Sequence, residues 1–277
     1  MQLSGRKKRL RPFFWLTFEA MFNIVSYGHQ IHPLRKGKCI SMRKIGIICA
    51  MDVELDAIRR SMETPVHTEV SHMHFYEGFI HGQSVVAACS GIGKVCAATC
   101  AQTLVIHFQV DEILCGGIAG ALVSMPHGSM AIADQLVQHD FDLASFGYHH
   151  GYLPTLGVKY IPTDVNIRRK MIQAAQTLGV TYQLGMIASG DRFIDSSALK
   201  QEILDRFPAI ACEMEGGAIA QVCYMNQVPF CVIRCISDSS DESAGDHSEI
   251  NEKMASDGAA ALILEYLREA ENHGEKN

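Results

Sequence analysis

Three carboxylates follow the ends of two apolar segments in the C-terminal half of the sequence. Glu213 and Glu215 follow the run Ala209–Cys212, and Asp238 follows the run Phe230–Ile236. Runs of this kind are typical of buried strands, and ligands of open α/β sheets bind beyond the carboxyl ends of the strands. Carboxylates at two such ends can transfer protons or stabilise positive charge in a shared pocket.

A structural role is the alternative for the first two acids. Gly216, Gly217 and Ala218 indicate that a closely packed helix begins directly after them, and the helix dipole favours anions in that position. The same explanation does not reach Asp238, because that residue ends an apolar strand.

Strands alternate with helices along the rest of the chain, which predicts a mainly parallel α/β sheet in one domain. Continuously apolar strands further indicate a sheet covered on both faces. A short strand at 111–115 is expected to end in the glycine-rich segment 116–120. The segment 139–163 has no clear period and is interpreted either as a lid or interface or as ordinary surface covering.

The first 41 residues differ from the rest. A basic segment at 6–11 precedes an apolar stretch at 12–25, as in a secretory signal, but Glu19 interrupts the stretch and it is too short to span a bilayer. We expect a poorly ordered extension at 1–41 and a single domain at 42–277. An export signal or membrane anchor is the alternative.

Composition excludes several classes of partner. The chain has 24 Lys and Arg against 30 Asp and Glu, a net charge of −6, so it lacks the basic footprint of a nucleic-acid-binding protein. Most of its 10 Cys lie in apolar runs, where reduced thiols act as small hydrophobic side chains. Their spacings match no common zinc signature, which predicts no metal and a cytoplasmic protein, with no membrane expected.

Three glycine-containing segments are expected to be turns: 90–94, 116–120 and 189–194. None forms a complete phosphate or dinucleotide loop, so we predict no cofactor. Lys94 is interpreted as a solvated lysine in the first turn of a helix. The third turn contains Phe193, whose ring is suited to stacking on a flat ligand.

Seven segments in register carry a family resemblance: 42–54, 90–95, 117–122, 146–148, 189–194, 213–215 and 234–238. Together they resemble the 5′-methylthioadenosine/S-adenosylhomocysteine nucleosidases of the purine nucleoside phosphorylase superfamily. The match leaves the first 41 residues outside it. The resemblance implies a three-layer α/β/α fold with a central mixed, partly barrel-like sheet, usually as a homodimer.

The resemblance also implies a reaction, the hydrolysis of the N-glycosidic bond of both thio-nucleosides to adenine and the 5′-thio-ribose. Glu54 would activate the attacking water, and Asp238, held by Ser237, would protonate adenine N7. Glu215 would bind the ribose hydroxyls, supported by Met214. An acid and a base on opposite sides of the scissile bond are what such a reaction needs.

The resemblance also implies which residues contact the rest of the ligand. Phe193 would stack on adenine, and the backbone at Ile194 would read its edge. Met51 and Ile92 would line the sugar and thioalkyl region. Two more positions match residues that family members contribute from the partner subunit of the homodimer: Leu143 and Phe146.

Two departures separate this chain from the family pattern. Family members commonly have a serine where this chain has Ile118, and they usually place an aromatic lid residue after the strand that ends at Asp238. The segment 239–250 contains no Phe, Tyr or Trp. One polar contact near the ribose and the closure of the lid are therefore in question.

Three other functions stay open. A phosphate-dependent nucleoside phosphorylase would need a cationic pocket, whereas Glu54 would repel phosphate and the first two glycine turns offer only Lys94. A non-catalytic nucleoside-binding protein is disfavoured because Glu54, Glu215 and Asp238 are all present. A futalosine-type nucleosidase remains an alternative, since the 5′ pocket accepts varied groups.

Overall fold

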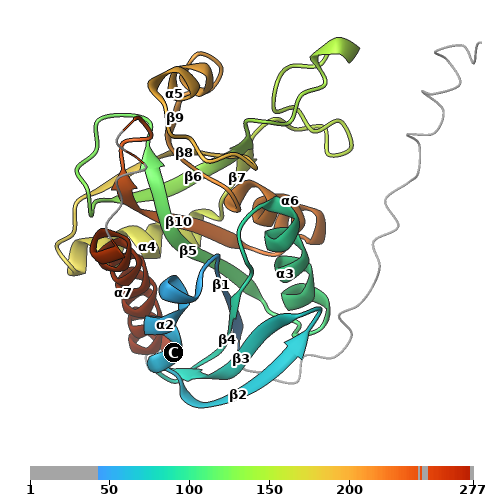
Figure 1. The fold of residues 1–277 in the computed structure, drawn as a ribbon. Helices are drawn as coiled ribbons and strands as arrows, with labels where there is room; N and C mark the ends of the chain where they lie inside the picture. Colours follow the sequence, from blue (N-terminus) through green and yellow to red (C-terminus); the bar gives the residue numbers. More distant parts are fainter. Residues whose placement is uncertain (1–42, 243, 245–248, 275–277) are drawn as a thin grey trace, which may run out of the picture. The chain divides into compact units, whose positions relative to one another are not determined.

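The computed structural model describes residues 43–242, 244 and 249–274 (Figure 1), which belong to the compact unit Met42–Asn277. The predicted extension at 1–41 lies outside the described residues. No helix among the described residues is long and apolar enough to cross a membrane.

One mixed sheet forms the centre of this unit, in the order β10-β6-β8-β9-β5-β1-β4-β3-β2, with β7 added to β6. A further pairing of β10 with β5 closes β5, β10, β6, β8 and β9 into a barrel-like ring. The strands are β1 (Lys44–Cys49), β2 (Glu63–Val70), β3 (Met73–Ile80), β4 (Gln83–Cys89), β5 (Glu112–Ala121), β6 (Met130–Gln138), β7 (Ile161–Pro162), β8 (Tyr182–Ser189), β9 (Ala209–Glu213) and β10 (Phe230–Asp238).

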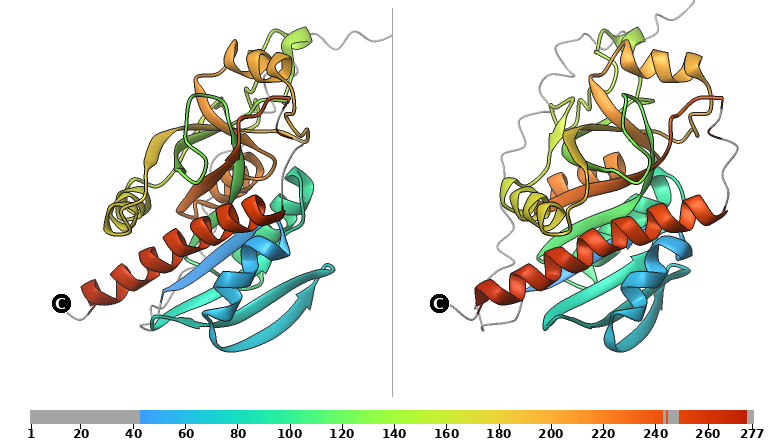
Figure 2. Two further views of the ribbon diagram at one scale, coloured as in Figure 1. Left: turned by 60° about the vertical axis from the view of Figure 1, so that its left-hand side comes forward. Right: turned by 90° about the vertical axis from the view of Figure 1, so that its left-hand side faces the viewer.

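Helices cover both faces of this sheet, as Figures 1 and 2 show. On one face lie α2 (Asp52–Arg60), α4 (Val165–Thr177) and α7 (Glu249–Gly274), and on the other α3 (Lys94–Ile106) and α6 (Gly216–Asn226). The remaining helices are α5 (Ser197–Leu204) and the short η1 (Ala144–Phe146). Alternation along β1 explains the two layers: Ile45 and Ile47 pack towards α2 and α7, whereas Ile48 packs towards α3.

The predicted fold class, three layers around a mixed and partly barrel-like sheet, is confirmed. The mainly parallel sheet predicted from the strand–helix alternation is wrong, because hairpins join β2, β3 and β4 and because β6 and β9 run antiparallel to β10 and β5. The sequence does not predict β2, because the residues of this strand are mostly exposed and show no apolar alternation.

The turn predicted at Gly116–Gly120 is also wrong. These residues continue β5, which pairs with β1 up to Cys115 and with β9 only from Gly120 onwards. Between those two points the strand has no partner on that side, because β1 and β9 diverge. A pocket opens at this fork.

Candidate active site

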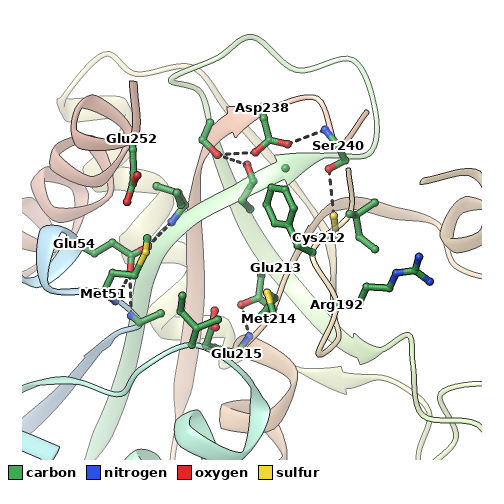
Figure 3. Close-up of a pocket in the computed structure, with 18 residues that line it drawn as sticks. Met51, Glu54, Arg192, Cys212, Glu213, Met214, Glu215, Asp238, Ser240 and Glu252 are labelled. Carbon is green, nitrogen blue, oxygen red and sulfur yellow. Dashed lines mark hydrogen bonds between the residues drawn. The ribbon is translucent and has the colours of Figure 1, made fainter. Parts of the chain in front are cut away.

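The pocket at the fork is lined by 18 residues, shown in Figure 3. Nine of the predicted site residues are among them: Met51, Glu54, Ile92, Phe193, Ile194, Met214, Glu215, Ser237 and Asp238. Leu143 and Phe146 do not line it. They lie at η1, where Phe146 is 78% exposed.

Glu54 is held entirely by backbone donors. It lies in the first turn of α2, where its Oε2 accepts hydrogen bonds from the N–H groups of Ala50 (2.8 Å) and Met51 (3.0 Å), as a helix-capping carboxylate does. Its Oε1 accepts a hydrogen bond from the N–H of Ile118 at 2.9 Å, at the unpaired side of β5. Burial raises the pKa of Glu54, and the charge of Arg234 partly offsets this rise.

The glycine next to Ile118 allows this approach. A Cβ atom at Gly117 would lie 2.6 Å from Glu54 Oε1 and 2.9 Å from Arg234 Nη1. The glycine-rich sequence therefore serves close contact between a strand and a carboxylate rather than a turn.

Asp238 is positioned by a β-bulge. The register of β10 against β5 shifts between Ile236 and Asp238, and bulges next to active sites re-aim side chains. Asp238 Oδ2 accepts a hydrogen bond from the hydroxyl of Ser237 at 2.8 Å, and Oδ1 accepts one from the N–H of Ser240 at 2.8 Å. The opposite strand has Gly120 here, where a Cβ would lie 2.7 Å from Asp238 Oδ1.

Arg234 is a buried residue beside the pocket that was not predicted as a site residue. Its buried guanidinium donates to Glu213 Oε2 and lies 3.5 Å from Glu215 Oε2. Glu213 also accepts hydrogen bonds from the hydroxyl of Ser189 and from two N–H groups at the start of α6. Although burial alone would raise it, the charge of Arg234 holds the pKa of Glu213 below its usual value. The available signal was a lone arginine within the apolar run Phe230–Ile236, since charged residues are rarely buried unless paired.

Glu215 faces a different environment from that of Glu213. Its Oε1 accepts a hydrogen bond from the N–H of Gly93 at 2.8 Å, in the loop between β4 and α3. Burial, and then the charge of Glu213, raise the pKa of Glu215 to about 7, although Arg234 opposes the rise. One carboxylate of the pair thus anchors the arginine, and the other is available to a ligand.

Comparison with known proteins shows the family of the chain. The Phosphorylase superfamily model matches residues 44–268. The 5′-methylthioadenosine/S-adenosylhomocysteine nucleosidase of Halalkalibacterium halodurans is 39% identical over 225 residues, which cover 80% of this chain and 97% of that protein. The chain belongs to this nucleosidase family.

Solved structures agree with the nucleosidase family assignment. The nucleosidase of Neisseria meningitidis in complex with methylthio-immucillin-A has a TM-score of 0.80 and 34% identity, covering 82% of this chain and all (100%) of that one. The futalosine hydrolase of Helicobacter pylori, at 31% identity, has a TM-score of 0.79 and covers 82% and 98%. The fold is therefore shared by two hydrolases with different substrates.

The remaining nucleosidase pocket is largely apolar around one exposed ring. Phe193 is 51% exposed in the loop after β8, and the following Ile194 is buried. Four polar residues that were not predicted as site residues also line the pocket: Arg192, Cys212, Ser240 and Glu252. In Figure 3 Glu252 lies on the side of Glu54 and Arg192 on the opposite side.

Two predictions from the sequence are not tested by the described residues. Among these residues no group of three or more His, Cys, Asp or Glu side chains could hold a metal ion, and the prediction that no metal or cofactor is needed stays a prediction. The segment expected to lack a lid aromatic includes 243 and 245–248, which lie outside the described residues.

Proposed function

We propose that this chain hydrolyses the N-glycosidic bond of 5′-methylthioadenosine and S-adenosylhomocysteine, giving adenine and the 5′-thio-ribose. The observation that carries the proposal is the pairing in one pocket of Glu54, fixed by three backbone donors, with Asp238, held by Ser237 and Ser240. The family assignment supports the same chemistry. We further propose that residues 42–277 act as one nucleosidase domain.

Asp238 acts as the general acid. Adenine is a poor leaving group until N7 is protonated, so an acid must stand on the base side of the bond. The hydroxyl of Ser237 suits both protonation states, because it lies 2.8 Å from Asp238 Oδ2 and 3.4 Å from the carbonyl oxygen of Ala119. It can donate to the ionised carboxylate, or accept from the protonated acid while donating to the carbonyl.

Glu54 acts as the general base for water. Its three backbone partners fix the carboxylate without neutralising its charge, and its raised pKa brings it closer to the range in which a base works near neutral pH. The ribosyl centre develops positive charge in the transition state, which Glu54 and Glu215 stabilise.

The other residues bind the nucleoside. Glu215 accepts from the ribose hydroxyls with Met214 beside it, and Phe193 stacks on adenine while the backbone of Ile194 contacts its edge. The thioalkyl group lies against two apolar side chains: Met51 and Ile92.

Phosphorolysis is disfavoured by the charges near Glu54. Phosphate would have to attack from the position of the water, beside an anionic carboxylate. The nearby cations are engaged: Arg234 with Glu213, and Lys94 with Asp140 at 2.6 Å. Arg192 lies on the opposite side of the pocket from Glu54.

We also propose a cytoplasmic homodimer that acts in methionine salvage. In it, Leu143 and Phe146 of each subunit reach the pocket of the other. The 78% exposure of Phe146 in a segment that does not line its own pocket supports this arrangement. The nine cysteines in the described part of the chain are all free, which fits a reducing compartment.

Adenine release from 5′-methylthioadenosine, measured with and without phosphate, tests the function. We expect equal rates in both and free 5′-methylthioribose as the second product. Release that requires phosphate and yields a sugar 1-phosphate would overturn the hydrolase assignment. If futalosine is turned over faster than either thio-nucleoside, the chain is a futalosine-type nucleosidase instead.

A further inference from the structure

Three loops meet beside the pocket, at the carboxyl ends of β4, β6 and β8. Each loop supplies one charged residue to a shared contact: Lys94 at the start of α3, Asp140 after β6 and Asp191 after β8. The prediction that Lys94 is solvated is wrong, because its side chain is only 17% exposed. Nothing in the catalytic scheme above assigns these three residues a role.

The three residues bind one another in a closed triangle. Lys94 Nζ donates to Asp140 Oδ1 at 2.6 Å, and Lys94 N donates to Asp191 Oδ1 at 2.7 Å. The third side is the N–H of Asp191, which donates to Asp140 Oδ2 at 2.9 Å. Each loop is therefore tied to both others by a charge-assisted hydrogen bond, the stronger class of hydrogen bond.

This triangle, which we call the loop clasp, connects two parts of the pocket. On one side, Gly93 directly precedes Lys94 and donates its N–H to Glu215 Oε1 at 2.8 Å. On the other side, Asp191 lies two positions before Phe193 in the same loop. The contact is close, since a Cβ on Gly93 (φ +97°) would lie 3.1 Å from Asp191 Oδ1.

We propose that Lys94, Asp140 and Asp191 are positioning residues that set the distance between the purine-stacking Phe193 and the ribose-binding Glu215. The inference rests on the proposed function, because it takes those two residues as the contacts to base and sugar. A ligand that spans both contacts depends on the clasp, whereas a ligand that uses only one does not. Intact nucleoside and free adenine therefore respond differently when the clasp is broken.

Binding measurements in a variant with impaired catalysis test this difference. We would measure dissociation constants of 5′-methylthioadenosine and of adenine by calorimetry, in Asp238→Asn protein with and without Lys94→Met. We expect the nucleoside to bind at least about tenfold more weakly without the lysine, because the substitution removes the charge-assisted hydrogen bond to Asp140 and a longer one from Lys94 Nζ to Gln138 Oε1 (3.3 Å). Adenine should change by less than about threefold, because stacking on Phe193 needs no fixed distance to Glu215.

Two variants serve as controls. Lys94→Arg keeps the charge and should restore most of the nucleoside affinity. Lys44→Met makes the same substitution in the Lys44–Glu77 ion pair (3.2 Å) at the start of β1, the end opposite the pocket, and should leave both affinities unchanged. Asp140→Asn, which loses the charge but keeps an acceptor for the N–H of Asp191, should weaken the nucleoside and not adenine.

Equal weakening of both ligands, or no change in either, would overturn the clasp as a positioning device. In otherwise wild-type protein, Lys94→Met should raise KM with kcat within about threefold, because the acid and base are untouched. If the wild-type protein turns over 5′-methylthioadenosine and Lys94→Met has the same KM, the clasp is rejected and the proposed function stands. A wild-type protein that neither binds nor cleaves the nucleoside would reject the proposed function itself.

Discussion

Glu54 and Asp238 are both buried carboxylates, but their hydrogen-bond partners differ in kind. Glu54 accepts only from N–H groups, one on Oε1 and two on Oε2. Asp238 accepts from the N–H of Ser240 and, unlike Glu54, also from a rotatable hydroxyl, that of Ser237. The two side chains should therefore respond differently to conversion into amides.

Asp238→Asn should lower kcat by about 100- to 10,000-fold with little loss of stability. The amide oxygen can still accept from Ser240, and its NH2 group can donate to the hydroxyl of Ser237. Glu54→Gln should lower kcat to a similar extent and also destabilise the fold by about 1–3 kcal/mol, because its NH2 group must face a backbone N–H. Steady-state kinetics and thermal unfolding of both variants check this contrast. Near-full activity of either, or equal stability of the two, would contradict it.

The raised pKa of Glu215 predicts how stability depends on pH. This carboxyl binds its proton more tightly in the folded state, so its contribution to folding is complete below its usual pKa of 4.5 and is lost as the pH rises through about 7. Glu215→Gln removes this loss and retains an acceptor for the N–H of Gly93. The variant should therefore gain Tm relative to the wild type between pH 5 and pH 8. A Tm difference that does not vary over this range would show that Glu215 titrates normally.

At the level of elements, the pocket depends on a position of β5, Gly117, that has no room for a side chain beside Glu54 of α2. Gly117→Ala places a methyl group 2.6 Å from Glu54 Oε1, which must move or break its bond with the N–H of Ile118. We expect kcat to fall at least tenfold and Tm to decrease, since buried misfits of this kind cost about 1–3 kcal/mol. Gly258→Ala in α7, where the added methyl group would meet only the side-chain ends of Met130 (3.1 Å) and Cys235 (3.4 Å), is the control for loss of a glycine. If Gly117→Ala retained full activity, the packing argument would fail.

The helices and strands also show how much of the fold and of the site the sequence alone predicts. Buried strands and amphipathic helices were found, because their apolar patterns reflect the two cores directly. The glycines of Gly116–Gly120 predict a turn, because only the folded structure shows that contacts with Glu54, Arg234 and Asp238 need the space. Arg234 stands out in the sequence as a lone arginine in an apolar run. Its role cannot be predicted, because only the fold brings it into contact with Glu213 and Glu215. Residues that the fold brings together from distant loops, such as Lys94 and Asp140, leave no trace in the local sequence.

For the whole molecule, the proposed exchange of residues between subunits can be tested by mixing. Phe146→Glu and Asp238→Asn should each be nearly inactive as pure proteins. Random reassociation makes half of the dimers hybrids, each with one intact site, so about a quarter of wild-type activity should return. Activity is assayed after mixing under conditions that exchange subunits, with size-exclusion chromatography to confirm the dimer. Failure to recover activity in verified hybrids would rule out shared sites.

The position of β5 in the sheet determines how this enzyme unfolds. The strand pairs with β1, β9 and β10, so it belongs to the open part of the sheet and to the closed ring at once. Neither part can open while leaving the other intact, and the backbone donor at Ile118 lies between them. Amide hydrogens of β5 should then exchange with solvent only when the entire domain unfolds. Heat would inactivate such an enzyme in a single cooperative step, with no folded but inactive intermediate.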